Sequence, residues 1–441
     1  MGGDAVFPAP RVCVVNLGCR VNRVESDWIE AAFRERGCVL VPEEDADLIA
    51  VNTCAVTGEA QAKTRKAVRH AATLPRRPLV AVTGCVANLF PSELESLGDN
   101  VCVLPAKEEL AAAALEIWSS QGSLGGNGER LGCEPAEPAG PGRLKRGVKV
   151  QDGCDNRCTY CIVWRARGIP RSADPADVEA QVRRVLAEGA REVELTGINL
   201  GRYCATGADG AALGLGGLLR RLAPLARQAS AVIRASSVEP PEVSAELVEA
   251  MAEHADVVCA HLHLPLQSGC SATLSRMGRR YDADGFARSV ELFRSALPHA
   301  SVSTDVIVGF PGETDEEFAE SLMFCEAMGF SKIHVFRFSA RPETPAASMP
   351  FQVDPLVLRR RSERLRAVAG ELRGRDARAR IGSVEPILVE RVEGAQGKGT
   401  SSSFHDAVVT LPDKGTPSPG LYRCRILSVQ GNGALRAAPV E

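Results

Sequence analysis

Three cysteines lie close together near the middle of the chain, at Cys154, Cys158 and Cys161. Their spacing is C-x3-C-x2-C, and they follow an alternating run at 148–152 that predicts a strand. Thiolates are soft ligands, and three of them can hold three irons of a [4Fe–4S] cube, leaving the fourth iron open to a small molecule. A zinc site is the alternative. It would require a fourth Cys or His ligand nearby, and the next histidine after Cys161 is His254.

A second set of three cysteines is spread over the first hundred residues. Strand-like runs alternate there with helical patterns, one of them at 26–36, and this alternation predicts a parallel sheet covered by helices. Each of three runs is followed by a cysteine: 11–17 by Cys19, 47–51 by Cys54 and 79–82 by Cys85. The carboxyl ends of parallel strands share one edge of a sheet, where ligands bind. We therefore expect these cysteines to converge; the alternative is three unrelated buried thiols.

The remaining sequence predicts two further domains of an α/β protein. The parallel-sheet domain covers 9–118, and 119–142 is rich in Gly, Pro, Ser and Glu, which is typical of a flexible linker. Residues 143–378 carry six strand-like runs separated by helical patterns, which predicts a partial (β/α)6 barrel. Those runs are 148–152, 192–197, 231–236, 261–266, 303–308 and 332–338. Residues 380–441 predict a small antiparallel β-barrel, because apolar and polar residues alternate between turns.

Composition limits where the protein works and what it binds. The 441 residues carry a net charge of −3, so a nucleic-acid partner would need a local basic patch. We expect no signal peptide and no membrane span, because the first residues lack a charged segment before an apolar one and no run of 18 apolar residues occurs. Fifteen cysteines without an export signal indicate a reducing cytoplasm and metal ligation.

The cysteine motifs carry a resemblance to a known family. The C-x3-C-x2-C spacing is that of the radical S-adenosylmethionine (SAM) superfamily. Leu-Gly-Cys-Arg-Val-Asn at 17–22, Asn-Thr-Cys-Ala-Val-Thr at 52–57 and Thr-Gly-Cys at 83–85 resemble the methylthiotransferases within it. The C-terminal barrel corresponds in place to the TRAM domain, which binds tRNA in that family. The resemblance implies a cytoplasmic transferase that modifies tRNA with two [4Fe–4S] clusters and SAM.

The resemblance also implies roles for individual residues. Cys154, Cys158 and Cys161 would hold the cluster that binds SAM, and Cys19, Cys54 and Cys85 would hold an auxiliary cluster. Tyr160, the aromatic before the third motif cysteine, would lie by the SAM adenine. Thr196 and Gly197, where the second barrel strand ends, would lie near the SAM amino group. No side chain is assigned as an acid or base, since the chemistry is that of a 5′-deoxyadenosyl radical.

The finer identity of the substrate follows from the first motif. Gly-Cys-Arg-Val-Asn at 18–22 resembles the subgroup that adds a methylthio group to the adenine ring of N(6)-L-threonylcarbamoyladenosine beside the tRNA anticodon. The alternatives are isopentenyladenosine in tRNA, a ribosomal-protein aspartate, or, in another class, a non-catalytic iron–sulfur RNA-binding protein. We expect a monomer served by a reduced flavodoxin- or ferredoxin-type electron donor.

Two basic stretches are candidates for RNA contacts. One runs from Lys63 to Arg77, and the other is an arginine-rich helical pattern from Arg359 to Arg380. Phosphate contacts and an ordinary solvated face are both compatible with such runs.

Overall fold

The computed structural model describes residues 10–120, 143–207, 210–412 and 417–440. The chain forms two compact units: unit 1 comprises Met1–Pro141 together with Cys161–Gly168, and unit 2 comprises Gly142–Tyr160 and Ile169–Glu441. The linker expected at 119–142 lies outside the described residues from 121 onward, and its first two residues end helix α5 (Leu110–Ser120). Among the described helices, none has the length and apolar character needed to cross a bilayer.

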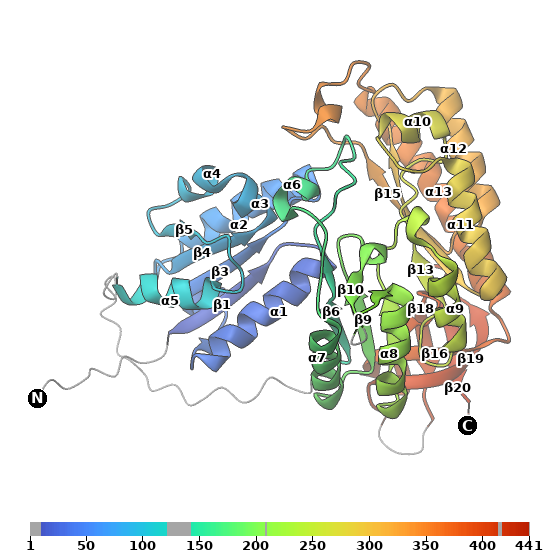
Figure 1. Cartoon of the computed structure of the whole chain (residues 1–441), viewed down its shortest axis with the longest axis horizontal. Coiled ribbons are helices and arrows are strands. Elements are labelled where there is room, and N and C mark those ends of the chain that lie inside the picture. Colours follow the sequence, from blue (N-terminus) through green and yellow to red (C-terminus); the bar gives the residue numbers. More distant parts are fainter. Residues whose placement is uncertain (1–9, 121–142, 208–209, 413–416, 441) are drawn as a thin grey trace, which may run out of the picture. The chain divides into compact units, whose positions relative to one another are not determined.

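Unit 1 is built on a five-stranded parallel sheet, drawn in blue in Figure 1. The strand order is β2-β1-β3-β4-β5, so β3 lies in the centre. The strands are β1 (Arg11–Asn16), β2 (Val39–Leu40), β3 (Leu48–Thr53), β4 (Leu79–Gly84) and β5 (Val101–Val103). This is the parallel sheet predicted from the alternating pattern, with strand bounds that differ by at most two residues for the three runs that precede cysteines.

Helices cover both faces of this sheet. Alternate residues of β3 point to opposite sides, with Ile49 and Val51 in one apolar cluster and Leu48 and Ala50 in another. The helices of unit 1 are α1 (Arg20–Glu35), α2 (Gly58–Ala72), α3 (Cys85–Leu89), α4 (Pro91–Glu95), α5 and α6 (Val163–Arg167). The helix expected at 26–36 begins six residues earlier, directly after Cys19.

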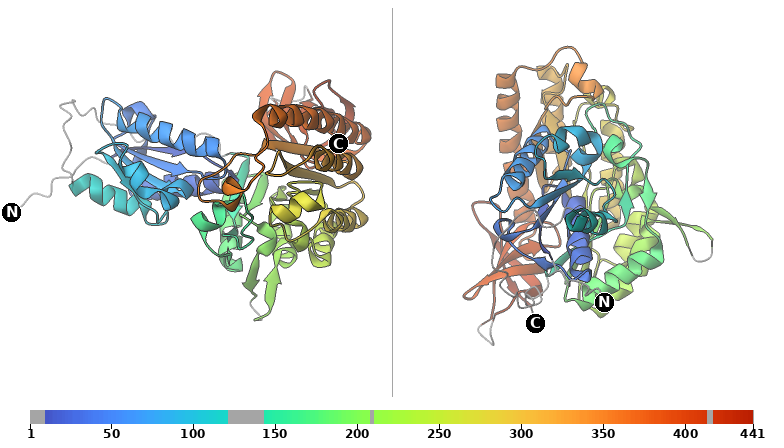
Figure 2. Two further views of the ribbon diagram at one scale, coloured as in Figure 1. Left: turned by 90° about the horizontal axis from the view of Figure 1, so that it is seen from above. Right: turned by 90° about the vertical axis from the view of Figure 1, so that its left-hand side faces the viewer.

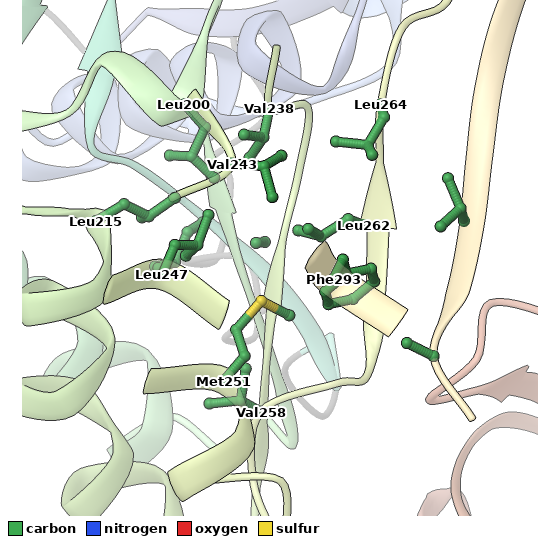
Figure 3. Close-up of a cluster of buried hydrophobic side chains, with 14 of the residues drawn as sticks. Leu200, Leu215, Val238, Val243, Leu247, Met251, Val258, Leu262, Leu264 and Phe293 are labelled. Carbon is green, nitrogen blue, oxygen red and sulfur yellow. The ribbon is translucent and has the colours of Figure 1, made fainter. Parts of the chain in front are cut away.

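Unit 2 contains the predicted partial barrel. Strands β12-β9-β6 and β13-β14-β15 form two parallel three-stranded sheets, and the parallel bridges Ile233–Val258 and Ser237–His263 link β12 to the β13 side. The strands are β6 (Lys145–Lys149), β9 (Glu192–Thr196), β12 (Val232–Ala235), β13 (His261–His263), β14 (Ser301–Val308) and β15 (Lys332–Arg337). Their helices are α7 (Pro175–Ala187), α8 (Leu215–Gln228), α9 (Ala245–Glu253), α11 (Ala283–Ala296), α12 (Asp315–Met328) and α13 (Pro355–Ala379). Figure 3 shows part of the apolar core between them, including Leu247, Met251, Leu262 and Phe293.

The C-terminal strands close into the small barrel that the sequence predicted, drawn in red in Figures 1 and 2. The order is β16-β17-β18-β20-β19, with β16 (Val384–Glu393), β17 (Gln396–Ser401), β18 (Asp406–Thr410), β19 (Gly420–Val429) and β20 (Leu435–Pro439). Contrary to the fully antiparallel expectation, β18 pairs with β20 in parallel. In the chain, β19 lies between β18 and β20. The last strand, β20, therefore pairs with both β18 and β19 and completes the closed barrel.

A loop of this small barrel packs against the amino-terminal ends of the larger barrel's strands. Phe404 stacks on His261, with ring centroids 4.7 Å apart, and the guanidinium carbon of Arg234 lies 5.2 Å from the centroid of the Phe404 ring. Arg234 is fully buried and donates to the carbonyl oxygens of Ser401 and Ser402, at 3.1 and 3.0 Å. These contacts occupy the amino ends, so the carboxyl ends of the strands remain for ligands, as in other parallel barrels.

A substitution at Gly84 tests how closely β3 and β4 approach each other at the edge of the unit 1 sheet. It adopts φ +97° and ψ −167°, a region open essentially to glycine, and a Cβ atom there would lie 2.4 Å from the Thr53 carbonyl oxygen. We expect Gly84→Ala to reduce the free energy of unfolding by about 3 kcal/mol, from backbone strain and overpacking together.

Gly37→Ala is the matched control for this variant. Gly37 also has a positive φ, +81°, but a Cβ there meets nothing within 4 Å. Its cost should be the strain alone, about 1 kcal/mol. Urea unfolding of both variants measures the difference, and equal losses would contradict the close approach at Gly84.

Candidate metal centres

The three N-terminal cysteines lie at the carboxyl ends of three neighbouring parallel strands. Cys19 follows β1 and caps the N-terminus of α1, Cys54 directly follows β3, and Cys85 directly follows β4 as the first residue of α3. Cys54 and Cys85 are buried, and Cys19 is partly exposed. A helix N-terminus favours an anionic group, so the position of Cys19 suits a thiolate.

The thiols of this set interact with one another. A hydrogen bond with Cys54 lowers the pKa of Cys19 to about 6, and the same interaction raises the pKa of Cys54 well above its usual range. The charge of Cys85 raises the pKa of Cys54 further. Cys54 therefore lies close enough to Cys19 and to Cys85 to interact with both.

These thiols fit a cluster better than a single metal ion. Within the described residues, no three His, Cys, Asp or Glu side chains are gathered tightly enough to bind one ion. A [4Fe–4S] cube does not require that arrangement, because each thiolate binds a different iron at a separate corner. Three converging thiols, one with a lowered pKa, provide a donor set of the right kind and number for a cube with one open iron.

A buried amide and hydroxyl network holds this edge of the sheet in place. The Asn22 Nδ2 donates to the Thr53 carbonyl at 2.8 Å, and Asn52 Nδ2 donates to the Asn22 carbonyl at 2.9 Å. The Thr53 hydroxyl donates to the Thr83 carbonyl at 2.7 Å and accepts from the Val86 amide at 3.1 Å. The residues beside Cys19, Cys54 and Cys85 are thus joined to one another. Sequence analysis assigned none of these supporting roles, although the same residues lie within the cysteine motifs.

The C-x3-C-x2-C loop begins in unit 2 and ends in unit 1. Cys154 and Cys158 follow the short strand β7 (Gln151–Asp152), and Cys161 is the first residue of the segment that belongs to unit 1. Cys158 is buried, and Cys154 and Cys161 are partly exposed. Burial raises the pKa of the Cys154 thiol. Gly153 has φ +76°, which turns the chain out of β7 toward Cys154.

Arg279 contacts this loop from a distant part of the chain. Its side chain is 3% exposed, and Nη1 lies 3.2 Å from both Cys158 Sγ and Tyr160 Oη. Glu239 forms an ion pair with the same guanidinium, and Tyr281 Oη accepts from Nη2 at 2.8 Å. Sequence analysis missed Arg279, because no pattern in the chain links it to a motif more than a hundred residues earlier.

Tyr160 lies beside the aromatic residues that follow strand β14. Its ring meets Phe310 edge to face, with centroids 6.4 Å apart and an interplanar angle of 81°. The Ala346 amide donates to the carbonyl of Thr159 at 2.9 Å, so a loop from the end of the barrel also fixes the Tyr160 backbone. The ring is held near the carboxyl end of β14.

Thr196 and Gly197 lie where β9 ends, but the Thr196 side chain is already engaged. Thr196 is buried, and its hydroxyl lies 3.4 Å from the Val148 carbonyl on β6. A Cβ at Gly197 would come within 2.9 Å of the Gln151 side chain, whose Oε1 accepts from the Ile198 and Asn199 amides at 2.9 Å. The close approach at Gly197 orders the turn.

Two other polar side chains are buried at this end of the barrel. Asn199, after β9, is 2% exposed, and Ser236, after β12, is 4% exposed. The Asn199 side chain interacts with the carboxylate of Glu242, whereas Ser236 Oγ makes no hydrogen bond with a described residue. Buried polar groups are normally satisfied, so the Ser236 hydroxyl fits a polar ligand at this edge, and SAM carries amino, carboxylate and hydroxyl groups.

Two family models match parts of the chain, and three relatives are similar to most of it. Residues 148–325 match the family described as the radical SAM superfamily, and residues 11–104 match the uncharacterized protein family UPF0004. The chain is 36% identical to threonylcarbamoyladenosine tRNA methylthiotransferase MtaB of Bacillus subtilis, over 81% of this chain and 79% of that one. It is 34% identical to tRNA-2-methylthio-N(6)-dimethylallyladenosine synthase of a Parafrankia species, over 88% and 79%. It is also 34% identical to ribosomal protein uS12 methylthiotransferase RimO of Desulforudis audaxviator, over 95% and 94%.

A solved structure resembles the fold. The radical SAM methyltransferase TsrM from Kitasatospora setae, with tryptophan and a SAM analogue bound, matches 77% of this chain and 75% of its own, with a TM-score of 0.54 and 17% identity. At this identity the likeness concerns the fold alone.

The two cysteine sets predict the iron content. We expect anaerobically reconstituted protein to bind about eight irons, four for each cluster. Replacing Cys154, Cys158 and Cys161 with Ala should leave about half, since the other set lies after different strands. Iron and protein assays on the same sample measure the ratio. Replacing Cys38, Cys204 and Cys424 instead should change nothing, whereas a folded motif triple mutant that keeps or loses all its iron would contradict two separate sites.

Proposed function

The chain belongs to the methylthiotransferases of the radical SAM superfamily, and we propose that it adds a methylthio group to carbon two of the adenine ring of N(6)-L-threonylcarbamoyladenosine in tRNA. As a member of that family it is an enzyme that transfers a sulfur-containing group and uses SAM and [4Fe–4S] clusters. The observation that carries the chemistry is the convergence of Cys19, Cys54 and Cys85 at one sheet edge, in addition to the C-x3-C-x2-C loop.

The residues divide between two tasks. When bound, one cluster would supply the electron for reductive cleavage of SAM, and the other would supply the sulfur for methylthio transfer. We assign Cys154, Cys158 and Cys161 to the first cluster and Cys19, Cys54 and Cys85 to the second. Arg279 orients Cys158 and the Tyr160 hydroxyl, and Ser236 offers a hydrogen bond to SAM. The protein's contribution is thus positioning and shielding rather than acid–base chemistry.

The choice of nucleoside rests on relatedness and on one motif. The relative named for threonylcarbamoyladenosine is 36% identical, and the relatives named for dimethylallyladenosine and for uS12 are each 34% identical. A difference of two percentage points in sequence identity does not by itself distinguish these substrates. The motif Gly18-Cys19-Arg20-Val21-Asn22, which lies at the auxiliary cysteines, favours the first.

Mass spectrometry of modified residues from a deletion strain distinguishes these substrates. We expect tRNA from that strain to lose 2-methylthio-N(6)-threonylcarbamoyladenosine and to accumulate the form without the methylthio group. Loss of the methylthio derivative of isopentenyladenosine, or of the modified uS12 aspartate, would assign one of the alternatives instead. A non-catalytic iron–sulfur RNA-binding protein would release no 5′-deoxyadenosine when incubated anaerobically with SAM and dithionite.

The two cysteine sets should do separable work. We expect Cys54→Ala to abolish methylthio transfer but to keep reductive cleavage of SAM, because Cys54 lies in unit 1 after β3 whereas Cys154 and Cys158 lie in unit 2. Cys158→Ala should abolish both. Chromatography of 5′-deoxyadenosine and of the nucleoside product measures the two steps. Normal product from folded Cys54→Ala protein would refute the auxiliary-cluster assignment.

Helix α13 is the stronger of the two candidate RNA surfaces, although only part of its arginine set is available. Arg361 is buried in ion pairs with Glu313 and Asp315, at 2.6 and 2.7 Å, and Arg380 pairs with Asp376 and Glu385. These arginines are structural. The exposed arginines of the helix are Arg359, Arg360, Arg364, Arg366, Arg375 and Arg378.

An aromatic side chain accompanies these exposed arginines. Phe351, shortly before α13, is 82% exposed and adopts φ +58°. A bulky residue in the left-handed region is strained, and such strain is concentrated at functional positions. Exposed aromatic faces stack on unpaired bases, so Phe351 beside a basic helix suits a single-stranded RNA loop.

The basic stretch from Lys63 to Arg77 is a weaker candidate. Each of five basic side chains there faces a carboxylate: Lys63 with Glu59, Arg65 with Glu93, His70 with Glu43, Arg76 with Asp47 and Arg77 with Asp99. These local pairs reduce the positive potential that phosphates would meet.

The α13 surface gives a salt-dependence test. We expect Arg359→Glu, Arg360→Glu and Arg364→Glu together to weaken tRNA binding and to flatten its dependence on salt, by about one unit of slope for each lost phosphate contact. SAM cleavage without tRNA should not change. Binding titrations at several salt concentrations measure both quantities.

The control carries the same charge change on other helices of unit 2. Arg183 and Arg184 on α7 and Arg227 on α8 are exposed, and their replacement by Glu alters net charge equally. An equal loss of affinity in both variants would mean that only overall charge matters. Unchanged affinity in the folded α13 variant would remove this helix from the binding surface.

A further inference from the structure

The peptide that follows the third motif cysteine is built into the N-terminal unit. Residues Cys161–Gly168 belong to unit 1, although the chain on either side belongs to unit 2. Ile162 and Ala166 are buried in the apolar cluster that contains Val86, next to Cys85. The Asn88 side chain donates to the Ala166 carbonyl at 2.9 Å. Helix α6, within this segment, is therefore fixed beside the α3 helix that begins at Cys85.

Arg167, the last residue of α6, enters a buried charge network. Its side chain is 4% exposed, and its two terminal nitrogens donate to the Glu25 carboxylate at 2.8 and 3.1 Å. Glu25 is 1% exposed and also forms an ion pair with Lys107. Two cations thus share one carboxylate, and the network carries one net positive charge in a region of low dielectric.

The same guanidinium reaches the candidate cluster ligands through one amide. Arg167 Nη2 donates to Asn22 Oδ1 at 2.7 Å, and that oxygen lies 3.7 Å from Cys19 Sγ. The other end of the Asn22 amide binds the carbonyl of Thr53, the residue before Cys54. Arg167 accordingly fixes the amide that lies between the Cys19 and Cys54 positions.

We propose that Arg167 is a positioning residue for the auxiliary cluster, so that the peptide after the SAM motif forms part of the auxiliary-cluster site. A cluster held by thiolates is anionic, and a net positive network beside it offsets that charge. Groups that orient metal ligands typically contribute 10- to 100-fold to metal affinity. This inference rests on the proposed assignment of Cys19, Cys54 and Cys85 as ligands.

Full-length protein with Cys154, Cys158 and Cys161 replaced by Ala isolates the auxiliary cluster for the test. In this background we expect Arg167→Met to release iron to a ferrous chelator about tenfold faster. The reduction potential of the auxiliary cluster in this variant, measured by redox titration with electron paramagnetic resonance, should fall. Reduction adds negative charge to the cluster, and the variant lacks a compensating cation. Glu25→Gln removes a negative charge from the same network and should raise the potential.

The reduction potential is expected to shift in opposite directions in Arg167→Met and Glu25→Gln, and this distinguishes an electrostatic role from a merely structural one. A structural role would lower thermal stability in both variants without shifting the potential in opposite directions. Arg167→Lys keeps the charge but cannot bind Glu25 and Asn22 together, so it should keep the potential near that of the parent and still release iron faster. Arg165→Met is the control, since Arg165 is an exposed arginine on the same helix, and it should behave as the parent.

The outcomes also separate this inference from the assignment beneath it. If the triple Cys→Ala parent with Arg167 intact binds no iron while folded, the auxiliary-cluster assignment itself is wrong. If that parent holds about four irons and neither Arg167→Met nor Glu25→Gln alters the iron release or the potential, the role of Arg167 is refuted. Should Arg167→Met fail to fold, Glu25→Gln and Arg167→Lys still decide.

Discussion

The order and register of three parallel strands are the constraint on which the N-terminal site depends. In β3 and β4, Thr53 pairs with Gly84, so Cys54 and Cys85 leave the sheet at the same level. In β1, Asn16 pairs with Asn52, and Cys19 follows three residues later at the head of α1. Side chains from positions far apart in the chain meet without any local motif, because the ends of parallel strands share an edge.

A buried arginine that is paired with a glutamate lies beside each of the two cysteine sets. Arg167 pairs with Glu25 near Cys19, and Arg279 pairs with Glu239 and approaches Cys158. A buried ion pair is weak evidence for stability, because the cost of desolvation can exceed the attraction between the charges. Both pairs instead direct a guanidinium toward a cysteine or its neighbour. An anionic cluster needs such nearby positive charge, and water cannot supply it in a buried site.

Elements could be predicted from the sequence where the local apolar pattern determines them. They could not be predicted where contacts with distant residues determine the structure. The ends of the strands that precede Cys19, Cys54 and Cys85 were predictable from the apolar runs to within two residues. The start of α1 was misplaced by six residues, because its N-cap is Cys19, which makes no side-chain capping hydrogen bond and is not a typical N-cap residue. Strand β17, Gln-Gly-Lys-Gly-Thr-Ser, has no apolar alternation and is held by its neighbours β16 and β18.

The arginine-rich helix shows the same limit at the level of side chains. Arg359 to Arg380 look alike in the sequence, yet Arg361 and Arg380 are buried and paired. Their carboxylate partners Glu313 and Glu385 lie on other elements, so the division into structural and exposed arginines follows from packing. Arg279 and Arg167 were likewise beyond prediction as supporting groups, since their roles arise from contacts more than a hundred residues away.

The two ends of the larger barrel differ in a way that restricts where chemistry takes place. At the amino ends, Phe404 lies among Lys145, Arg234 and Lys332, at 5.8, 5.2 and 4.9 Å from its ring, and the C-terminal barrel occupies that end. At the carboxyl ends, Ser236 keeps a buried hydroxyl without a described partner. An amino end covered by packing and a polar group left for a ligand at the carboxyl end are the pattern expected of a parallel barrel. By packing against the amino ends, the C-terminal barrel leaves the carboxyl ends, where Tyr160 and Arg279 lie, as the end that can receive a ligand.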